Sequence, residues 1–165
     1  YDEAEDAGRY AAERERFDLV ALARGCVEGY RSAYRDTPFT LELPERALEI
    51  SGGADLAAQL LDKLVENAVE FSRAGEPVRL SLEAHDGAAL LCVENKGPRL
   101  PAEMRGRLFD SMVSLRGERG GQGPHLGLGL YVARLIAEFH GGTIEAADLP
   151  AGDGVVVRVR LPLAR

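Results

Sequence analysis

Apolar residues recur at helical spacing in three stretches of the sequence. They predict helices over residues 17–34, 54–71 and 128–139, because side chains three and four positions apart lie on one face of a helix. The middle stretch is the clearest, with an apolar stripe on one side and a polar face on the other. The stripe contains Leu56, Leu60, Leu61, Leu64, Val65, Ala68 and Val69, and the polar face carries Lys63, Glu66, Asn67 and Glu70.

Shorter apolar segments with extended character lie between these helices. His85-Asp86-Gly87, which separates two of them, is a hairpin signal. Helices and strands in this order predict an α/β two-layer sandwich, with one mixed sheet of about five strands and helices on a single face. The segments expected to be extended are residues 39–43, 47–50, 77–83, 88–94, 143–147 and 155–161.

Two segments lack this periodicity. Residues 1–16 are charged and have few apolar anchors, which indicates a linker or the end of an upstream helix ahead of one domain at 17–165. Residues 96–125 are rich in Gly, Arg and Pro. An irregular segment of that length is uncommon in a compact domain and is typical of an active-site lid. Because the chain opens at Tyr1 and not at Met, we expect it to be a piece of a longer protein.

The composition is that of an acidic globular domain. The chain has 165 residues, 45% of them hydrophobic, enough for one domain with a sizeable core. Its 20 Lys and Arg against 27 Asp and Glu give a formal charge of −7, which disfavours broad contact with nucleic acid or anionic lipid. No apolar run approaches the roughly 20 residues of a membrane span. Cys26 and Cys92 lie in apolar stretches, so we expect buried thiols.

Glycines gather at the start of the third predicted helix, in the segment GGQGPHLGLGL at residues 120–130. Glycine lets the backbone approach a phosphate closely, and the free N–H groups of a helix N-terminus favour an anion. A mobile surface loop is the alternative. The preceding segment adds a local charge of +3, which also favours an anionic ligand such as a triphosphate. It carries Lys96, Arg99, Arg105, Arg107, Arg116 and Arg119 against Glu103, Asp110 and Glu118.

Two asparagines are candidate ligand contacts. Asn67 lies on the polar face of the middle helix, where it is either an ordinary surface residue or a hard oxygen ligand suited to Mg²⁺. Asn95 ends a predicted strand before a Gly-Pro turn, and it is either part of that turn or a donor and acceptor pair for an adenine edge.

Taken together, these segments resemble the ATPase domain shared by histidine kinases, DNA gyrase, the Hsp90 chaperones and the MutL repair proteins. Residues 60–71 resemble the histidine kinase N box, and residues 95–99 occupy the place of the first glycine box, usually Asp-x-Gly-x-Gly. Residues 108–112 resemble the phenylalanine box, 127–130 the second glycine box, and 139–142 the turn after the helix. The resemblance covers roughly residues 17–163. The segments LLDKLVENAVEFS and LFDSMVSLRG are most similar to the sensor kinase of the proteobacterial dedicated sortase system.

This resemblance implies the Bergerat-type fold and assigns roles to single residues. Asn67 becomes the Mg²⁺ ligand and a catalytic residue together with Lys63, and Asn95 becomes the adenine contact. Gly127 and Gly129 become the glycines beside the phosphates. The remaining residues expected to contact the nucleotide are Glu70, Gly97, Arg116, His125, Leu126 and Leu128.

The sequence departs from the family pattern at four positions. Asn95 replaces an aspartate and so gives up a charge-assisted hydrogen bond, worth about 1 kcal/mol. Lys63 stands where most kinases have asparagine and gyrase a catalytic glutamate; it contacts a phosphate or pairs with Glu66. Glu70 replaces a basic residue, and Arg99 replaces a glycine. Each of these changes bears on how tightly nucleotide binds.

The resemblance implies a catalytic domain that presents Mg-ATP to a histidine on a separate dimerisation domain. His85 sits in a hairpin turn and His140 at a helix C-terminus before Gly-Gly, which favours structural roles for both, and His125 lies in the predicted lid. The implied partners are ATP, the parent's own dimerisation domain and a response regulator. The implied parent is a membrane-anchored homodimer with this domain in the cytoplasm. The alternatives are a degenerate signalling module that binds little or no ATP, and a stand-alone serine kinase of the anti-sigma-factor type.

Overall fold

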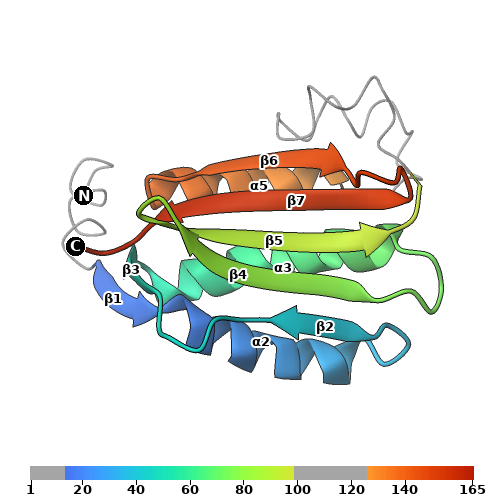
Figure 1. Ribbon diagram of the computed structural model, residues 1–165, viewed down its shortest axis with the longest axis horizontal. Coiled ribbons are helices and arrows are strands. Elements are labelled where there is room, and N and C mark those ends of the chain that lie inside the picture. Colours follow the sequence, from blue (N-terminus) through green and yellow to red (C-terminus); the bar gives the residue numbers. More distant parts are fainter. Residues whose placement is uncertain (1–13, 99–125) are drawn as a thin grey trace, which may run out of the picture.

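The computed structural model describes residues 14–98 and 126–165, except for the side chains of residues 126–128. Three long helices and seven strands occupy these ranges (Figure 1). The helices are α2 (Leu19–Ala33), α3 (Ala54–Phe71) and α5 (Leu126–Phe139). The strands are β1 (Glu15–Asp18), β2 (Phe39–Glu42), β3 (Glu49–Gly52), β4 (Val78–His85), β5 (Ala88–Lys96), β6 (Thr143–Asp148) and β7 (Gly154–Pro162).

Five of the strands form one mixed sheet in the order β2-β4-β5-β7-β6. Only the β2–β4 pair is parallel, and the other three pairs are antiparallel. All three helices lie behind this sheet on the same side (Figure 1). The predicted two-layer α/β sandwich is therefore confirmed. A separate antiparallel pair, β1 with β3, lies at the same end of the molecule as the C-terminus (Figure 1).

The start of the first helix differs from the prediction. Residues 15–18 form strand β1, so the helix begins at Leu19 and not at residue 17. The side chain of Asp18 explains the boundary, because its Oδ1 accepts hydrogen bonds from the backbone N–H groups of Val20 at 2.9 Å and Leu48 at 3.1 Å. An aspartate that caps a helix leaves the residues before it free to pair as a strand. The third helix likewise starts two residues earlier than expected, at Leu126.

The core lies between the sheet and the helices. Leu60, Leu61 and Leu64 of α3 are almost completely buried there, as the apolar stripe predicts. A hydrogen bond from the Tyr30 hydroxyl to Asp62 Oδ1, at 2.6 Å, joins α2 to α3. Both cysteines are unpaired, as expected, but they are only partly buried. No helix within the described ranges has the length and apolar character needed to cross a membrane.

The β4–β5 hairpin turns at His85-Asp86-Gly87, as predicted. Asp86 and Gly87 have φ angles of 49° and 76°, the left-handed values that a two-residue hairpin turn requires. The turn leaves His85 exposed at the end of β4. Nothing in the described part of the chain gives this histidine a chemical role.

His140 begins the turn after α5, and its side chain contacts the N-terminal end of α3. Its Nδ1–H donates to the Ile136 carbonyl at 2.9 Å, and its Nε2 accepts from the Gly53 N–H at 3.2 Å. Gly52 is packed so closely against the ring that a Cβ there would lie 2.1 Å from His140 Cδ2. Burial lowers the pKa of His140; the hydrogen bond to Ile136 opposes part of that shift and Arg14 adds to it. These contacts give His140 a structural role, as the sequence indicated.

Candidate functional site

The C-terminal end of α3 and the end of β5 meet at very close range. A Cβ placed on Gly97 would lie 2.1 Å from the carbonyl oxygen of Phe71 and 3.5 Å from Asn95 Nδ2. The Arg73 N–H also donates to the Lys96 carbonyl at 2.8 Å. Gly97 is therefore required by the approach of helix to strand, because any side chain would push the two apart. Asn67 lies one helical turn before this junction.

The Asn95 side chain points to the helix side of the sheet. It follows Leu91 and Val93 at every second position of β5, and both of those residues are buried in the core. Its ladder partners on the neighbouring strands are Val78 and Val155, which are apolar and buried. Asn95 is 3% exposed, and its Nδ2 has no hydrogen-bond partner among the described residues. A buried amide nitrogen therefore faces the end of α3 with its hydrogen atoms unused.

Asn67 is also buried, at 9% exposure. The interpretation of Asn67 as an ordinary surface residue was therefore wrong. The reason is that α3 packs against α5 as well as against β5, so residues beside its apolar stripe are covered too. Asn67 Oδ1 is buried and has no hydrogen-bond partner in the part of the chain that the structure describes. An acceptor and a donor thus remain unsatisfied at one end of the molecule.

These two are the only asparagines in the chain. Leaving a buried polar group unpaired costs about 1–3 kcal/mol, so such groups in folded proteins call for an explanation. A ligand that supplies a donor or a cation to Asn67, and an acceptor to Asn95, provides one. The described residues contain no cluster of three or more His, Cys, Asp or Glu able to hold a metal ion by themselves. A single amide oxygen nevertheless fits Mg²⁺, which takes few protein ligands and fills its shell with phosphates and water.

The first turn of α5 forms another side of this site. Gly127 and Gly129 lie within it, and no acidic residue accompanies them. A helix start of this kind presents free N–H groups and a positive dipole end. Lys63 of α3 runs past this turn, since a Cβ on Gly129 would lie 3.9 Å from Lys63 Cδ. The Lys63 ammonium group pairs with Glu66 at 3.8 Å, one of the two interactions expected for it.

The other predicted contact residues divide into three groups. Glu70 is exposed on α3 and has no ion-pair partner among the described residues, so its carboxylate is free to turn away from an anion. Leu126 and Leu128 belong to α5, although their side chains lie outside the described part. Arg116 and His125 lie outside the described residues altogether, as do Arg99 and the segment 108–112.

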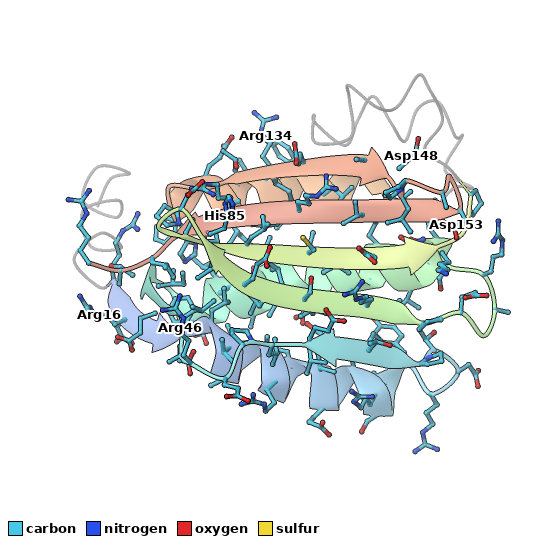
Figure 2. The ribbon with its side chains drawn as sticks, viewed as in Figure 1. Arg16, Arg46, His85, Arg134, Asp148 and Asp153 are labelled. Atoms are coloured by element: carbon cyan, nitrogen blue, oxygen red, sulfur yellow. The ribbon has the colours of Figure 1, made fainter. Side chains whose placement is uncertain are left out.

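A backbone hydrogen bond from Gly97 N–H to the Asp153 carbonyl, at 2.9 Å, ties the end of β5 to the turn before β7. Lys96 Nζ and Asp153 Oδ2 lie 3.8 Å apart in the same place. Figure 2 shows Asp153 at the end of the sheet where β5 finishes, and His85 at the opposite end. The junction that carries Asn95 is therefore held from both sides.

The sequence interpretation missed the apolar neighbours of Asn95. Val78 and Val155 flank its side chain across the sheet and leave it no polar neighbour in the ladder. The signal was available, because Ala89, Leu91, Val93 and Asn95 alternate along one predicted strand. Because alternate residues of a strand point to the same face, this spacing places Asn95 on the buried face.

Comparison with known proteins gives consistent matches to one family. Residues 52–165 match the family described as "Histidine kinase-, DNA gyrase B-, and HSP90-like ATPase". The sensor protein CutS of Streptomyces coelicolor is 34% identical over 152 residues, covering 92% of this chain and 36% of CutS. The chain therefore spans about a third of the length of that relative.

Solved structures agree with this match. The catalytic domain of histidine kinase ThkA, in a nucleotide-free form, has a TM-score of 0.77 at 25% identity and covers 91% of this chain and 97% of that domain. Full-length ShkA in complex with AMPPNP has a TM-score of 0.74 at 23% identity, covering 92% of this chain and 31% of ShkA. The ShkA comparison supports the likeness of fold alone.

Proposed function

The chain belongs to the histidine kinase-, DNA gyrase B- and HSP90-like ATPase family and is an ATP-binding catalytic domain of the sensor histidine kinase type; from this premise we propose that Asn67 and Asn95 hold Mg-ATP for phosphoryl transfer to a histidine elsewhere in a longer parent protein. The observation that carries the proposal is the pair of buried, unpartnered amide atoms at the junction of α3 and β5.

Asn95 is the proposed adenine contact. The unpaired Nδ2–H of Asn95 would donate a hydrogen bond to the ring nitrogen N1 of adenine. Rotation of the side-chain amide would allow the Asn95 oxygen to accept a hydrogen bond from the N6 amino group. The apolar side chains of Val78 and Val155 beside it suit the flanks of a purine ring. Family membership supports a nucleotide as the ligand, and the structurally similar ShkA was solved in complex with AMPPNP.

Asn67 is the proposed Mg²⁺ ligand. Its Oδ1 would bind the ion, which would supply positive charge to the triphosphate oxygens during transfer. Lys63 would help to position the phosphates. The first turn of α5 would do so too, through the backbone N–H groups around Gly127 and Gly129 and through Leu126 and Leu128. Glu70 would contact the ion only through water. Gly97, Arg116 and His125 complete the proposed contact set.

The acceptor histidine is proposed to lie in the parent protein outside this chain. His140 uses both ring nitrogens in backbone hydrogen bonds, and His85 stands at the opposite end of the sheet from Asn95. His125 lies outside the described residues. We therefore expect this chain to bind ATP without completing a phosphoryl transfer alone, and the parent to act as a histidine protein kinase.

Further properties of the parent are proposed from the relatives of this chain, which include a sensor protein and a signal transduction histidine-protein kinase. The parent would form a homodimer through its own phosphoacceptor domain and would pass the phosphoryl group to a cognate response regulator. It would be anchored in the membrane, with this ATP-binding domain in the cytoplasm. The finer likeness to the kinase of the dedicated sortase system is also a proposal. It predicts that the parent gene lies beside genes of that system.

Titration calorimetry with ATP, with and without Mg²⁺, tests the proposal. We expect binding that strengthens with Mg²⁺, and loss of the Mg²⁺-dependent part in Asn67→Ala. Gln59→Ala is the matched control, since Gln59 is an exposed amide on the same helix. A folded chain that binds no nucleotide at millimolar concentration would replace this proposal with the degenerate signalling module, which the exposed Glu70 carboxylate and the loss of a charge at Asn95 favour.

A further inference from the structure

The Asn95 side chain also bears on which purine the site accepts. We propose that Asn95 makes the site tolerant of 6-oxopurine nucleotides, those of hypoxanthine and guanine, alongside ATP. The inference rests on the proposed function, because it takes the surroundings of Asn95 as the place of the base.

Nothing in the described part of the chain fixes the orientation of the Asn95 amide. Its Nδ2 has no hydrogen-bond partner there, and its ladder neighbours Val78 and Val155 are apolar. A rotation of 180° about the last side-chain bond exchanges the carbonyl oxygen and the amino group while keeping the same shape. Both orientations are therefore open to Asn95 until a ligand selects one.

Adenine and the 6-oxopurines differ in the hydrogen-bonding groups along one edge of the ring. Adenine presents a donor, the N6 amino group, beside an acceptor, N1. A 6-oxopurine presents the reverse, an acceptor at O6 beside a donor at N1–H. An amide carries one donor group and one acceptor group side by side, so either of its two orientations complements one of these edges.

A carboxylate at the position of Asn95 would favour adenine. An ionised aspartate offers acceptors only. An oxygen placed to accept from the N6 amino group of adenine meets O6 of a 6-oxopurine as a second acceptor, and the base must shift before its N1–H can donate to the carboxylate. Sites that leave a buried polar group unpaired reject such ligands strongly. With Asn95 flanked by valines and 3% exposed, water has little access to relieve that conflict. The amide thus removes a barrier that a carboxylate would impose.

The test compares ATP with inosine triphosphate, both with Mg²⁺, by calorimetry on the 165-residue chain. Inosine triphosphate lacks the 2-amino group of guanine, so the comparison isolates the 6-position and N1. For the wild type we expect the two dissociation constants to agree within about fivefold. In Asn95→Asp, which should still bind ATP, we expect the preference for ATP over inosine triphosphate to rise by at least about tenfold.

The outcomes separate this inference from its premise. Wild-type protein that binds ATP but binds inosine triphosphate at least about tenfold more weakly overturns the inference and leaves the proposed function standing. The inference is also overturned if the wild type and Asn95→Asp prefer ATP over inosine triphosphate by the same factor. A folded wild type that binds neither nucleotide overturns both. Should aspartate at this buried position prevent folding, the wild-type ratio alone decides the matter. A parallel titration with guanosine triphosphate then shows whether a 2-amino group is also accommodated.

Discussion

The two ends of helix α3 treat buried polar groups in opposite ways. At the N-terminal end, His140 donates to the Ile136 carbonyl and accepts from the Gly53 N–H, so both of its nitrogens are used. At the C-terminal end, Asn67 Oδ1 and Asn95 Nδ2 are buried with no partner among the described residues. The first arrangement fastens the fold. On the function proposed above, the second leaves hydrogen-bonding capacity for a nucleotide.

The contrast gives a physical way to separate structural from functional polar residues in this domain. A satisfied buried group stabilises the native state, and its removal leaves backbone groups unpaired. An unsatisfied buried group stabilises nothing until a ligand arrives, so its removal should affect binding and not folding. The following predictions probe that difference.

The largest effect is expected from His140→Ala. It removes both hydrogen bonds and leaves a cavity against Gly52, so we expect the free energy of unfolding to fall by about 3 kcal/mol. Urea denaturation measures this change. His85→Ala, at a histidine with a side chain 62% exposed, should stay within about 0.5 kcal/mol of the wild type. Equal losses in the two variants would contradict the structural role of His140.

Asn67→Ala should show the reverse behaviour. Mg²⁺-dependent ATP affinity is expected to fall by at least about 30-fold, or about 2 kcal/mol, because a charge-assisted contact is lost. The free energy of unfolding should change little or rise slightly, since a buried unpaired oxygen is removed. Denaturation and calorimetry on the same preparation measure both quantities. A large loss of stability with unchanged ATP affinity would make Asn67 a structural residue.

A smaller effect should follow the titration of His140. Its pKa is lowered by burial, so the native state favours the neutral ring while the unfolded chain binds a proton near pH 6.5. The resulting stability is complete above that pH and is lost as the pH falls through the lowered native pKa, at no more than about 1.4 kcal/mol per pH unit. We expect urea midpoints at pH 7.5 and 5.5 to differ more for the wild type than for His140→Phe. If His140→Phe kept the wild-type pH dependence of the urea midpoint, the effect would come from carboxylates and not from His140.

The smallest effect is expected from Lys63→Met. The exposed pair with Glu66 at 3.8 Å contributes less than about 1 kcal/mol to stability. The position of Lys63 beside Gly129 predicts a fall in ATP affinity of about threefold to tenfold. Arg31→Met is the control for binding, because Arg31 forms a similar pair with Glu28 at 3.8 Å on α2. If ATP affinity were unchanged in Lys63→Met, Lys63 would have no role in binding phosphate and would only form the ion pair with Glu66.

The sequence predicted most of the architecture because its periodicities are strong. The stripe of α3 placed that helix at residues 54–71, and Asp86-Gly87 fixed the β4–β5 turn. Strand β1 was missed because it has only four residues and pairs with β3, which lies more than thirty positions away in the sequence. Such a short pairing depends on tertiary contacts that leave little trace in the local pattern.

The candidate site was predicted less completely than the fold. Residue type and spacing pointed to Asn67 and Asn95, but neither predicts that both side chains are buried without partners. That property arises where α3, β5 and α5 converge, and only the folded chain brings them together. Gly97 was expected to contact nucleotide, whereas its packing against the Phe71 carbonyl gives it a structural reason to be glycine.

The most direct test observes the side-chain amides themselves. The chain has two asparagines and two glutamines, so its ¹⁵N–¹H spectrum should contain four side-chain amide pairs. On addition of Mg-ATP we predict that the Asn67 and Asn95 pairs shift, while that of the exposed Gln59 on the same helix stays in place. Nucleotide binding that moves neither asparagine would contradict the claim that these two amides are held for the ligand.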